Sequence, residues 1–67
     1  MNDESFEERV RHHLWLYTEP DFAAKEAALN FFRANAHQVV PVLVRLADKG
    51  DRVAGEMLTV ARAAASE

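Results

Sequence analysis

The stretch from His37 to Ala47, HQVVPVLVRLA, most constrains what this chain can fold into. It consists mainly of Val and Leu, and its only full charge is Arg45. On a helix, with about 100° between successive residues, its apolar side chains leave only a narrow wedge, which holds Pro41, Arg45 and Asp48. Because so apolar a helix has to be covered on two sides, we expect it to be the buried centre of a small helical domain.

The start of this central helix stays open on sequence alone. Asn35 could cap a helix that contains Pro41, which would kink it at a cost of about 3 kcal/mol. Alternatively, the helix begins near Val40 with Pro41 in its first turn, and residues 34–39 form an irregular corner. The β-branched content also permits a strand over residues 39–46, which Pro41 and the lack of a second strand-like segment oppose.

The N-terminal segment carries the signals of a helix. Ser5 and Glu8 have the spacing of a capping box, which predicts a helix that runs to about Tyr17, with residues 1–4 frayed. The positions that share its apolar face are Phe6, Val10, His13, Leu14 and Tyr17. Trp15 points the other way, between Glu8 and Arg11.

A second helix is expected from about Pro20 to Arg33. Thr18 and Asp21 have capping-box spacing, and Pro is tolerated in a first helical turn. The side chains expected to face inward are Ala23, Ala24, Ala27, Ala28, Phe31 and Phe32. Phe22 and Leu29 lie off that arc.

The last helix is expected from about Arg52 to Ala65. Gly50 predicts the end of the preceding helix and Asp51 the N-cap of this one. Its inward positions are Val53, Ala54, Met57, Leu58, Val60, Ala61 and Ala64. Gly55 costs about 1 kcal/mol relative to Ala, and one reason for it would be a close neighbour.

Together these segments predict an all-α fold: a single domain, residues 1–67, of four short helices in two antiparallel hairpins. A shift of 30 residues aligns Val10 with Val40 and Asp21 with Asp51. Each half then consists of an apolar helix, a short polar turn with an Asp, and an Ala-rich helix. This weak repeat leaves a stacked arrangement and a compact bundle both open.

The second half, PVLVRLADKGDRVAGEML, resembles a HEAT-type helical hairpin. Pro41 precedes the leucine-rich helix, Asp48 ends it, and Val53 opens the second helix. The segment departs from the HEAT pattern at Ala54, where an Arg normally follows the Val. The resemblance implies a binding scaffold and not an enzyme, although HEAT arrays need about three or more repeats.

Size and charge narrow the classes of partner. At 67 residues without Cys, a single core is only marginally sufficient, so with 49% hydrophobic residues we expect a homodimer. The net charge of −3 argues against a nucleic-acid or anionic-membrane partner. The acidic N-terminus is unlike a signal peptide, and no apolar run approaches about 18 residues, so a cytoplasmic protein without a membrane span is expected.

The polar residues predict neither catalysis nor a bound cofactor. No nucleophile stands beside a base, and Gly50 and Gly55 are isolated, so a phosphate-binding loop is lacking. Glu8 and His12 lie four residues apart, a spacing that could hold a metal ion. Adjacent His12 and His13 point about 100° apart on a helix, however, so we expect no metal site.

Large apolar residues outside the inward faces are typical of interfaces. We therefore predict a protein–protein interaction module, an adaptor or an inhibitor, with a partner-binding surface of Trp15, Arg11, Phe22, Leu29 and Arg33. Alternatively, the first helix is covered on both sides and Trp15 belongs to the core. The function predicted from a different class is a nucleic-acid-binding regulator that uses Arg9, Arg11, His12 and His13.

Overall fold

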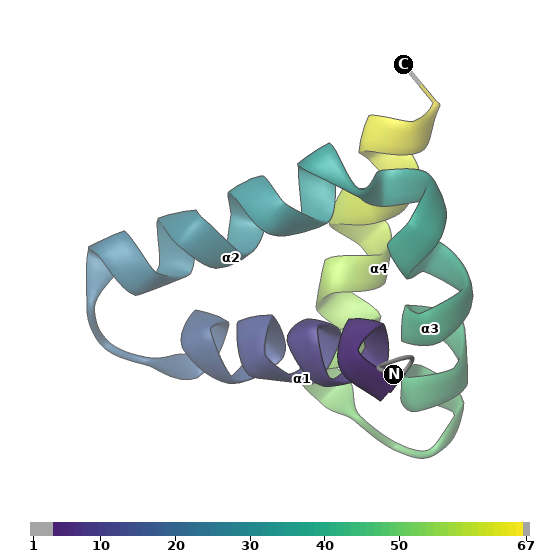
Figure 1. Ribbon diagram of the computed structural model, residues 1–67, viewed down its shortest axis with the longest axis horizontal. Coiled ribbons are helices and arrows are strands. Elements are labelled where there is room, and N and C mark those ends of the chain that lie inside the picture. Colours follow the sequence, from purple (N-terminus) through teal and green to yellow (C-terminus); the bar gives the residue numbers. More distant parts are fainter. Residues whose placement is uncertain (1–3, 67) are drawn as a thin grey trace.

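The computed structural model describes the backbone of residues 4–66 and the side chains of residues 6–66. This part of the chain forms four helices and no strand: α1 (Glu4–Thr18), α2 (Phe22–Ala34), α3 (Ala36–Asp48) and α4 (Arg52–Ala65). α1 and α2 make one antiparallel hairpin, α3 and α4 make the other, and the two lie crosswise (Figure 1). The predicted all-α fold is confirmed, and the strand considered for residues 39–46 is wrong.

The turn between α1 and α2 is capped differently from the prediction. Thr18 does not open α2, because its hydroxyl donates to the Trp15 carbonyl at 2.7 Å and closes α1 instead. Asp21 is the N-cap of α2, with extended backbone and a carboxylate that accepts from the amide of Ala23 at 3.4 Å. Pro20 explains the break, since a proline disfavours helical backbone in the residue before it.

The other predicted cap, at Ser5, falls on a side chain outside the described residues. The backbone of α1 already begins at Glu4, inside the segment expected to fray. At the far end of the chain, α4 ends at Ala65, as expected.

Helix α3 begins at Ala36 and contains Pro41, the first of the two starts considered. Pro41 is exposed and has no N–H to offer the carbonyl of His37, so it interrupts the ladder at the surface. Asn35 occupies the N-cap position without a side-chain capping bond, because its amide nitrogen donates to the Phe31 carbonyl at 2.9 Å. This single residue joins α2 to α3.

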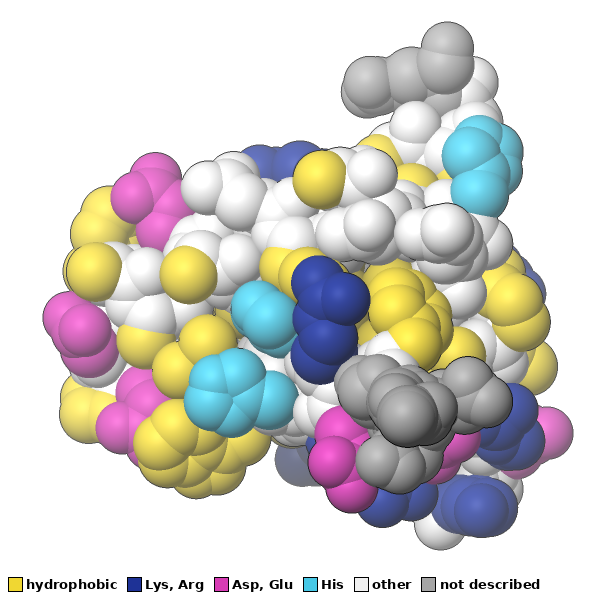
Figure 2. Space-filling view, viewed as in Figure 1, with side chains coloured by type: hydrophobic (Ala, Val, Ile, Leu, Met, Phe, Trp, Pro, Cys, Tyr) yellow, Lys and Arg dark blue, Asp and Glu magenta, His cyan; other side chains and the backbone are white. Residues whose placement is uncertain are grey.

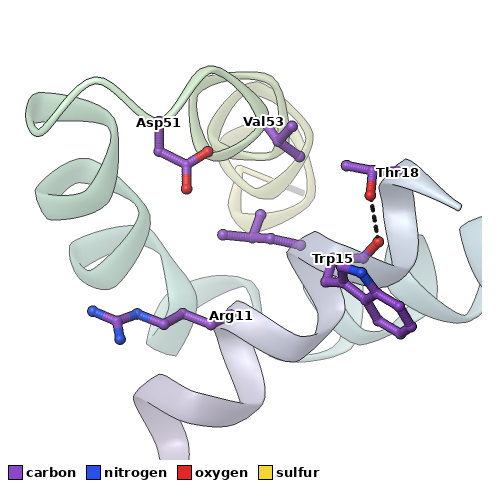
Figure 3. A pocket seen from close by; sticks show the side chains of 6 residues that line it. Arg11, Trp15, Thr18, Asp51 and Val53 are labelled. Carbon is purple, nitrogen blue, oxygen red and sulfur yellow. Dashed lines mark hydrogen bonds between the residues drawn. The ribbon is translucent and has the colours of Figure 1, made fainter.

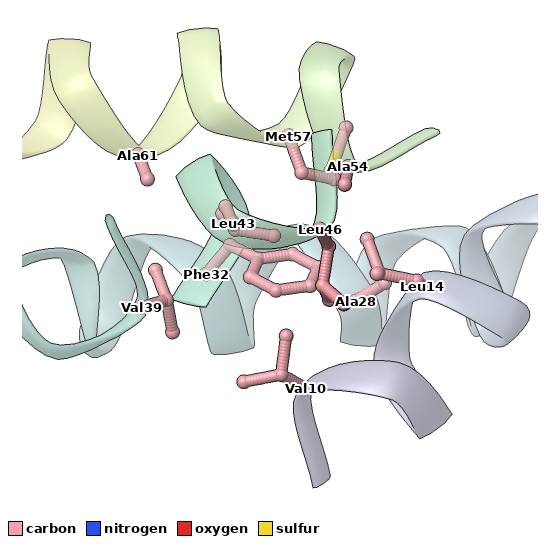
Figure 4. Close-up of a cluster of buried hydrophobic side chains, with 10 residues drawn as sticks. All are labelled: Val10, Leu14, Ala28, Phe32, Val39, Leu43, Leu46, Ala54, Met57 and Ala61. Carbon is pink, nitrogen blue, oxygen red and sulfur yellow. The ribbon is translucent and has the colours of Figure 1, made fainter. Parts of the chain in front are cut away.

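Helix α3 contributes buried residues to the core, as expected, but it is covered on one face and not on two. One face of α3 is buried, through Ala36, Val39, Leu43 and Leu46, and packs mainly on α4. Val40, Val42 and Val44 keep part of their surface in solvent. The largest fully buried side chain is instead Phe32 of α2, which lies among residues of the other helices in Figure 4.

Both hairpins contribute to one core. Its buried members are Val10, Leu14, Ala28, Phe32, Val39, Leu43, Leu46, Ala54, Met57 and Ala61. Met57 and Ala61 of α4 were predicted to face inward, and so were Val10 and Leu14 of α1. Every helix contacts the other three, but α4 packs more extensively on α1 and α2 than α3 does, so α4 contributes most of the contact between the two hairpins.

Helix α2 is rotated relative to its predicted face. Ala23 and Ala27, expected inward, are exposed, whereas Leu29 and Lys25 are half-buried. The Lys25 ammonium donates to the Tyr17 carbonyl at 2.6 Å and lies 5.0 Å from the centroid of the Tyr17 ring. A Leu side chain and a Lys stem bury more apolar area than two Ala methyl groups, which favours this orientation.

The turn before α4 follows the prediction. Gly50 has a φ of +100°, the left-handed backbone expected of a helix-stopping Gly. The Asp51 carboxylate accepts from the amide of Ala54 at 3.0 Å and caps α4. The close neighbour expected at Gly55 is absent, because a Cβ built there would meet nothing within 4 Å. None of the four helices between residues 4 and 66 is both long enough and apolar enough to span a membrane.

Candidate partner-binding surface

Two large hydrophobic side chains of the described residues are exposed, and both flank the turn that joins α1 to α2. Trp15 has 56% of its surface in solvent and Phe22 has 74%. The alternative that placed Trp15 in the core is therefore wrong for the isolated chain. We call residues 15–26, which comprise the end of α1, the turn and the start of α2, the hairpin tip.

Trp15 also lies at the rim of an open groove between α1 and the start of α4. The groove has a volume of about 270 Å³ and is lined by Arg11, Leu14, Trp15, Thr18, Asp51 and Val53. Figure 3 shows Arg11 and Asp51 on one side of it and Trp15 and Thr18 on the other. Leu14 is buried and Val53 is half-buried, so the groove has an apolar floor and a polar rim.

The rim charges of this groove already have partners. Arg11 pairs with Glu7 of the same helix at 3.0 Å, and Glu7 also pairs with Arg45 of α3. The carboxylate of Asp51 holds the first turn of α4. Both charged groups of the rim are therefore engaged within the chain.

The turn between the two exposed aromatic residues of the hairpin tip is rich in carboxylates. Glu19, Asp21 and Glu26 lie within or next to the turn, and Glu26 is one helical turn after Phe22. The cation of the tip, Lys25, is directed at the Tyr17 carbonyl. Figure 2 shows acidic and hydrophobic side chains interspersed over the end of the molecule where α1 meets α2.

The structure does not bring all five predicted surface residues together. Arg11 and Trp15 share the α1–α4 groove, and Phe22 lies at the same hairpin tip. Leu29 is half-buried and packs against the core. Arg33 lies roughly 16 Å further along α2 than Phe22, at 1.5 Å per residue. It lines a different groove, of about 530 Å³, with Thr59, Val60, Ala63 and Ala64.

The basic side chains of α1 that were predicted for nucleic-acid binding do not form one surface either. Arg9 and His13 lie over Phe31 of α2: the Arg9 guanidinium carbon is 5.7 Å from the Phe31 ring centroid. The His13 ring stacks on the Phe31 ring, with centroids 3.8 Å apart. His12 lies beside Trp15, at 5.9 Å between ring centroids. Arg11 is separate from them, paired with Glu7.

Sequence reasoning missed two contributors to these surfaces. Phe31 and Val53 were expected inward, and both are half-buried and pack against the core. The unpredicted contacts are those of Phe31 with His13 and Arg9 and that of Val53 with the groove beside Leu14. The (i, i+4) spacing of Arg9 and His13 places both side chains on one face of α1, which is the sequence signal for their shared contact with Phe31. The contact of Val53 with Leu14 had no local signal in the sequence, because packing of α1 against α4 alone brings these two residues together.

The described part of the chain contains no group of three or more His, Asp or Glu side chains that could hold a metal ion. No protein-family model matches the chain, and comparison with curated proteins and with solved structures finds no match. The likeness of the second half to a HEAT hairpin therefore stays a resemblance in the residues quoted above.

Proposed function

We propose that this protein is a non-enzymatic interaction module, an adaptor or an inhibitor, that binds another protein through the hairpin tip. The observation that carries the proposal is the exposure of two large aromatic side chains, Trp15 near the end of α1 and Phe22 at the start of α2. The remaining large apolar side chains of residues 6–66 are buried or half-buried.

The energetic argument rests on the size of these rings. Fully burying one large apolar side chain contributes about 1.5–3 kcal/mol, and interface energy concentrates in a few Trp, Tyr and Arg residues. Trp15 lies at the rim of the groove with the apolar floor, and Phe22 lies on the other side of the turn. We propose that one partner covers both rings. Arg11, at the opposite side of the groove, is the polar contact we assign to the same partner.

The alternative of nucleic-acid binding through Arg9, Arg11, His12 and His13 has less support. Arg11 and Arg45 both pair with Glu7, which lowers the positive potential of this face. Phosphate binding needs unpaired cations along a continuous path. The carboxylates of the hairpin tip lie at the end of the same helix and oppose a phosphate backbone.

The test is a pull-down from the native host with the tagged chain and with Trp15→Ala and Phe22→Ala variants. We expect a protein that the wild-type chain captures and each variant loses, while Val44→Ala on α3 retains it. Equal capture by all four chains would reject the tip as the binding surface. Binding to random DNA with a steep salt dependence would favour the nucleic-acid alternative.

The proposal includes a cytoplasmic location and a homodimer. Light scattering of the wild-type chain over a range of concentrations would show whether it is a homodimer. Melting temperatures should then rise with concentration, since an associating state is stabilised by mass action.

A further inference from the structure

We propose that the surface which the hairpin tip recognises is basic: an apolar pocket, or a pair of pockets, rimmed by Lys and Arg. This inference rests on the proposed function and names the chemistry of the partner. It follows from the charges that surround the two exposed rings.

The apolar part of the contact is small. Trp15 and Phe22 are separated by the turn, and the positions between them that face solvent are Thr18, Pro20 and Asp21. A partner that covers both rings must therefore also cover the turn and its charges. Burying a charge without a counter-charge is costly, so the groups facing the turn decide which partners are accepted.

Those charges are predominantly negative. Within residues 15–26, the exposed Asp21 and Glu26 and the half-buried Glu19 stand against one cation, Lys25. In the groove beside Trp15, the charge of Arg11 is offset by Glu7, with which it pairs, and by Asp51. The Lys25 side chain is half-buried and its ammonium already donates to the Tyr17 carbonyl within the tip, so part of its hydrogen-bonding capacity is used inside the chain. A docked surface would therefore meet a net negative charge at the turn between the two rings.

This arrangement also disfavours two other occupants. A nucleic acid would bring phosphates against the carboxylates. A two-fold dimer through the tip would bring together two copies of the same net negative patch. Like charges opposed across an interface disfavour association. A Lys- or Arg-rich partner surface instead pairs with all three groups.

The experiment is a selection from a displayed library of random 16-residue peptides on the wild-type chain. Peptides that also bind the Trp15→Ala/Phe22→Ala double variant are removed. We expect the remaining peptides to carry a net positive charge and at least one large apolar residue. Trp15 is the only Trp of the chain, so its fluorescence reports the binding of a selected peptide at the tip.

Charge variants then test the role of the carboxylates. Glu19→Gln/Glu26→Gln removes two charges of the tip and leaves the Asp21 cap intact, and we expect it to weaken binding of a selected peptide by roughly threefold to tenfold. Glu56→Gln, on the exposed face of α4, removes a charge away from the tip and should change binding less than twofold. Raising the salt concentration should weaken wild-type binding and bring it toward that of the double Gln variant.

The outcomes separate this inference from the proposed function. Tip-dependent peptides that are neutral or acidic, or that bind the double Gln variant unchanged, overturn the basic partner and leave the interaction module standing. A selection that yields no peptide dependent on Trp15 and Phe22 counts against both. Self-association of the wild-type chain that Trp15→Ala abolishes would make a second copy the occupant and overturn the inference.

Discussion

The imidazole of His13 lies parallel to the ring of Phe31, with 3.8 Å between centroids and 8° between planes. His13 is held in place by its own helix: Nδ1 is 2.7 Å from the Arg9 carbonyl, and since a carbonyl only accepts, the Nδ1–H donates. The stack therefore joins α1 to α2.

This stack should contribute to stability beyond the area it buries. Aromatic pairs are worth about 0.5–1.5 kcal/mol in excess of burial. In a double-mutant cycle of His13→Ala and Phe31→Ala we expect a coupling free energy of about 1 kcal/mol, measured by denaturant unfolding. The cycle is needed because Phe31 also contacts Phe6, Phe32 and Arg9. A coupling near zero would show that the two rings are only adjacent.

The phenylalanines of α2 should differ sharply in their contribution to folding. Phe32 is fully buried, and truncation to Ala should cost about 3–5 kcal/mol. A chain of this size has a total stability of about 3–10 kcal/mol, so Phe32→Ala should be partly or wholly unfolded. Phe22 is 74% exposed, and Phe22→Ala should change the free energy of unfolding by less than about 0.5 kcal/mol.

Circular dichroism during thermal unfolding compares the two variants directly. If Phe22→Ala melts as early as Phe32→Ala at every concentration, Phe22 has a role in folding and its loss cannot be used to test binding. If the shift occurs only at high concentration, Phe22 lies in a contact between copies.

The capping signals before α4 predicted its start correctly, whereas Thr18 closes α1 and does not open α2. Gly50 and Asp51 placed the boundary before α4 correctly, because backbone conformation and capping depend on adjacent residues. The face of α2 was misplaced because Ala fits either environment, and the orientation was decided by where Leu29 and the Lys25 stem could pack.

The residues predicted for the candidate site were also placed correctly only in part. Trp15 was expected to point away from the apolar face of its helix, and it does. Leu29 and Arg33 were grouped with it by helix geometry alone, which cannot tell that one end of α2 meets α4 and the other forms a turn. The groove that joins Arg11 to Asp51 depends on contacts between residues far apart in sequence, and no local pattern records them.

The two glycines should respond to substitution with opposite signs. At Gly55 an added Cβ meets nothing within 4 Å and the backbone is helical, so Gly55→Ala should stabilise the chain by about 1 kcal/mol. Such a gain raises the melting temperature by roughly 4–8 °C in a domain of this size. Gly50 has a φ of +100°, so Gly50→Ala should cost about 1–2 kcal/mol although the space around it is empty.

Paired thermal melts of these variants measure both effects under identical conditions. A destabilised Gly55→Ala chain would mean that something approaches α4 at this point, and the predicted close neighbour would then be a second molecule.

Asp51 has two roles that a pair of substitutions separates. It caps α4 through the Ala54 amide, and it lines the groove beside Trp15. Asp51→Ala should cost about 1 kcal/mol of folding stability through loss of the cap, whereas Asp51→Asn keeps a capping oxygen and should cost far less. Denaturant unfolding of both variants gives this comparison.

The Asn variant also removes the charge from the groove, so a selected peptide that contacts Asp51 through a cation should bind this variant less tightly, at nearly unchanged folding stability. Equal destabilisation by Ala and Asn would show that the charge at the helix start, and not the hydrogen bond, stabilises α4.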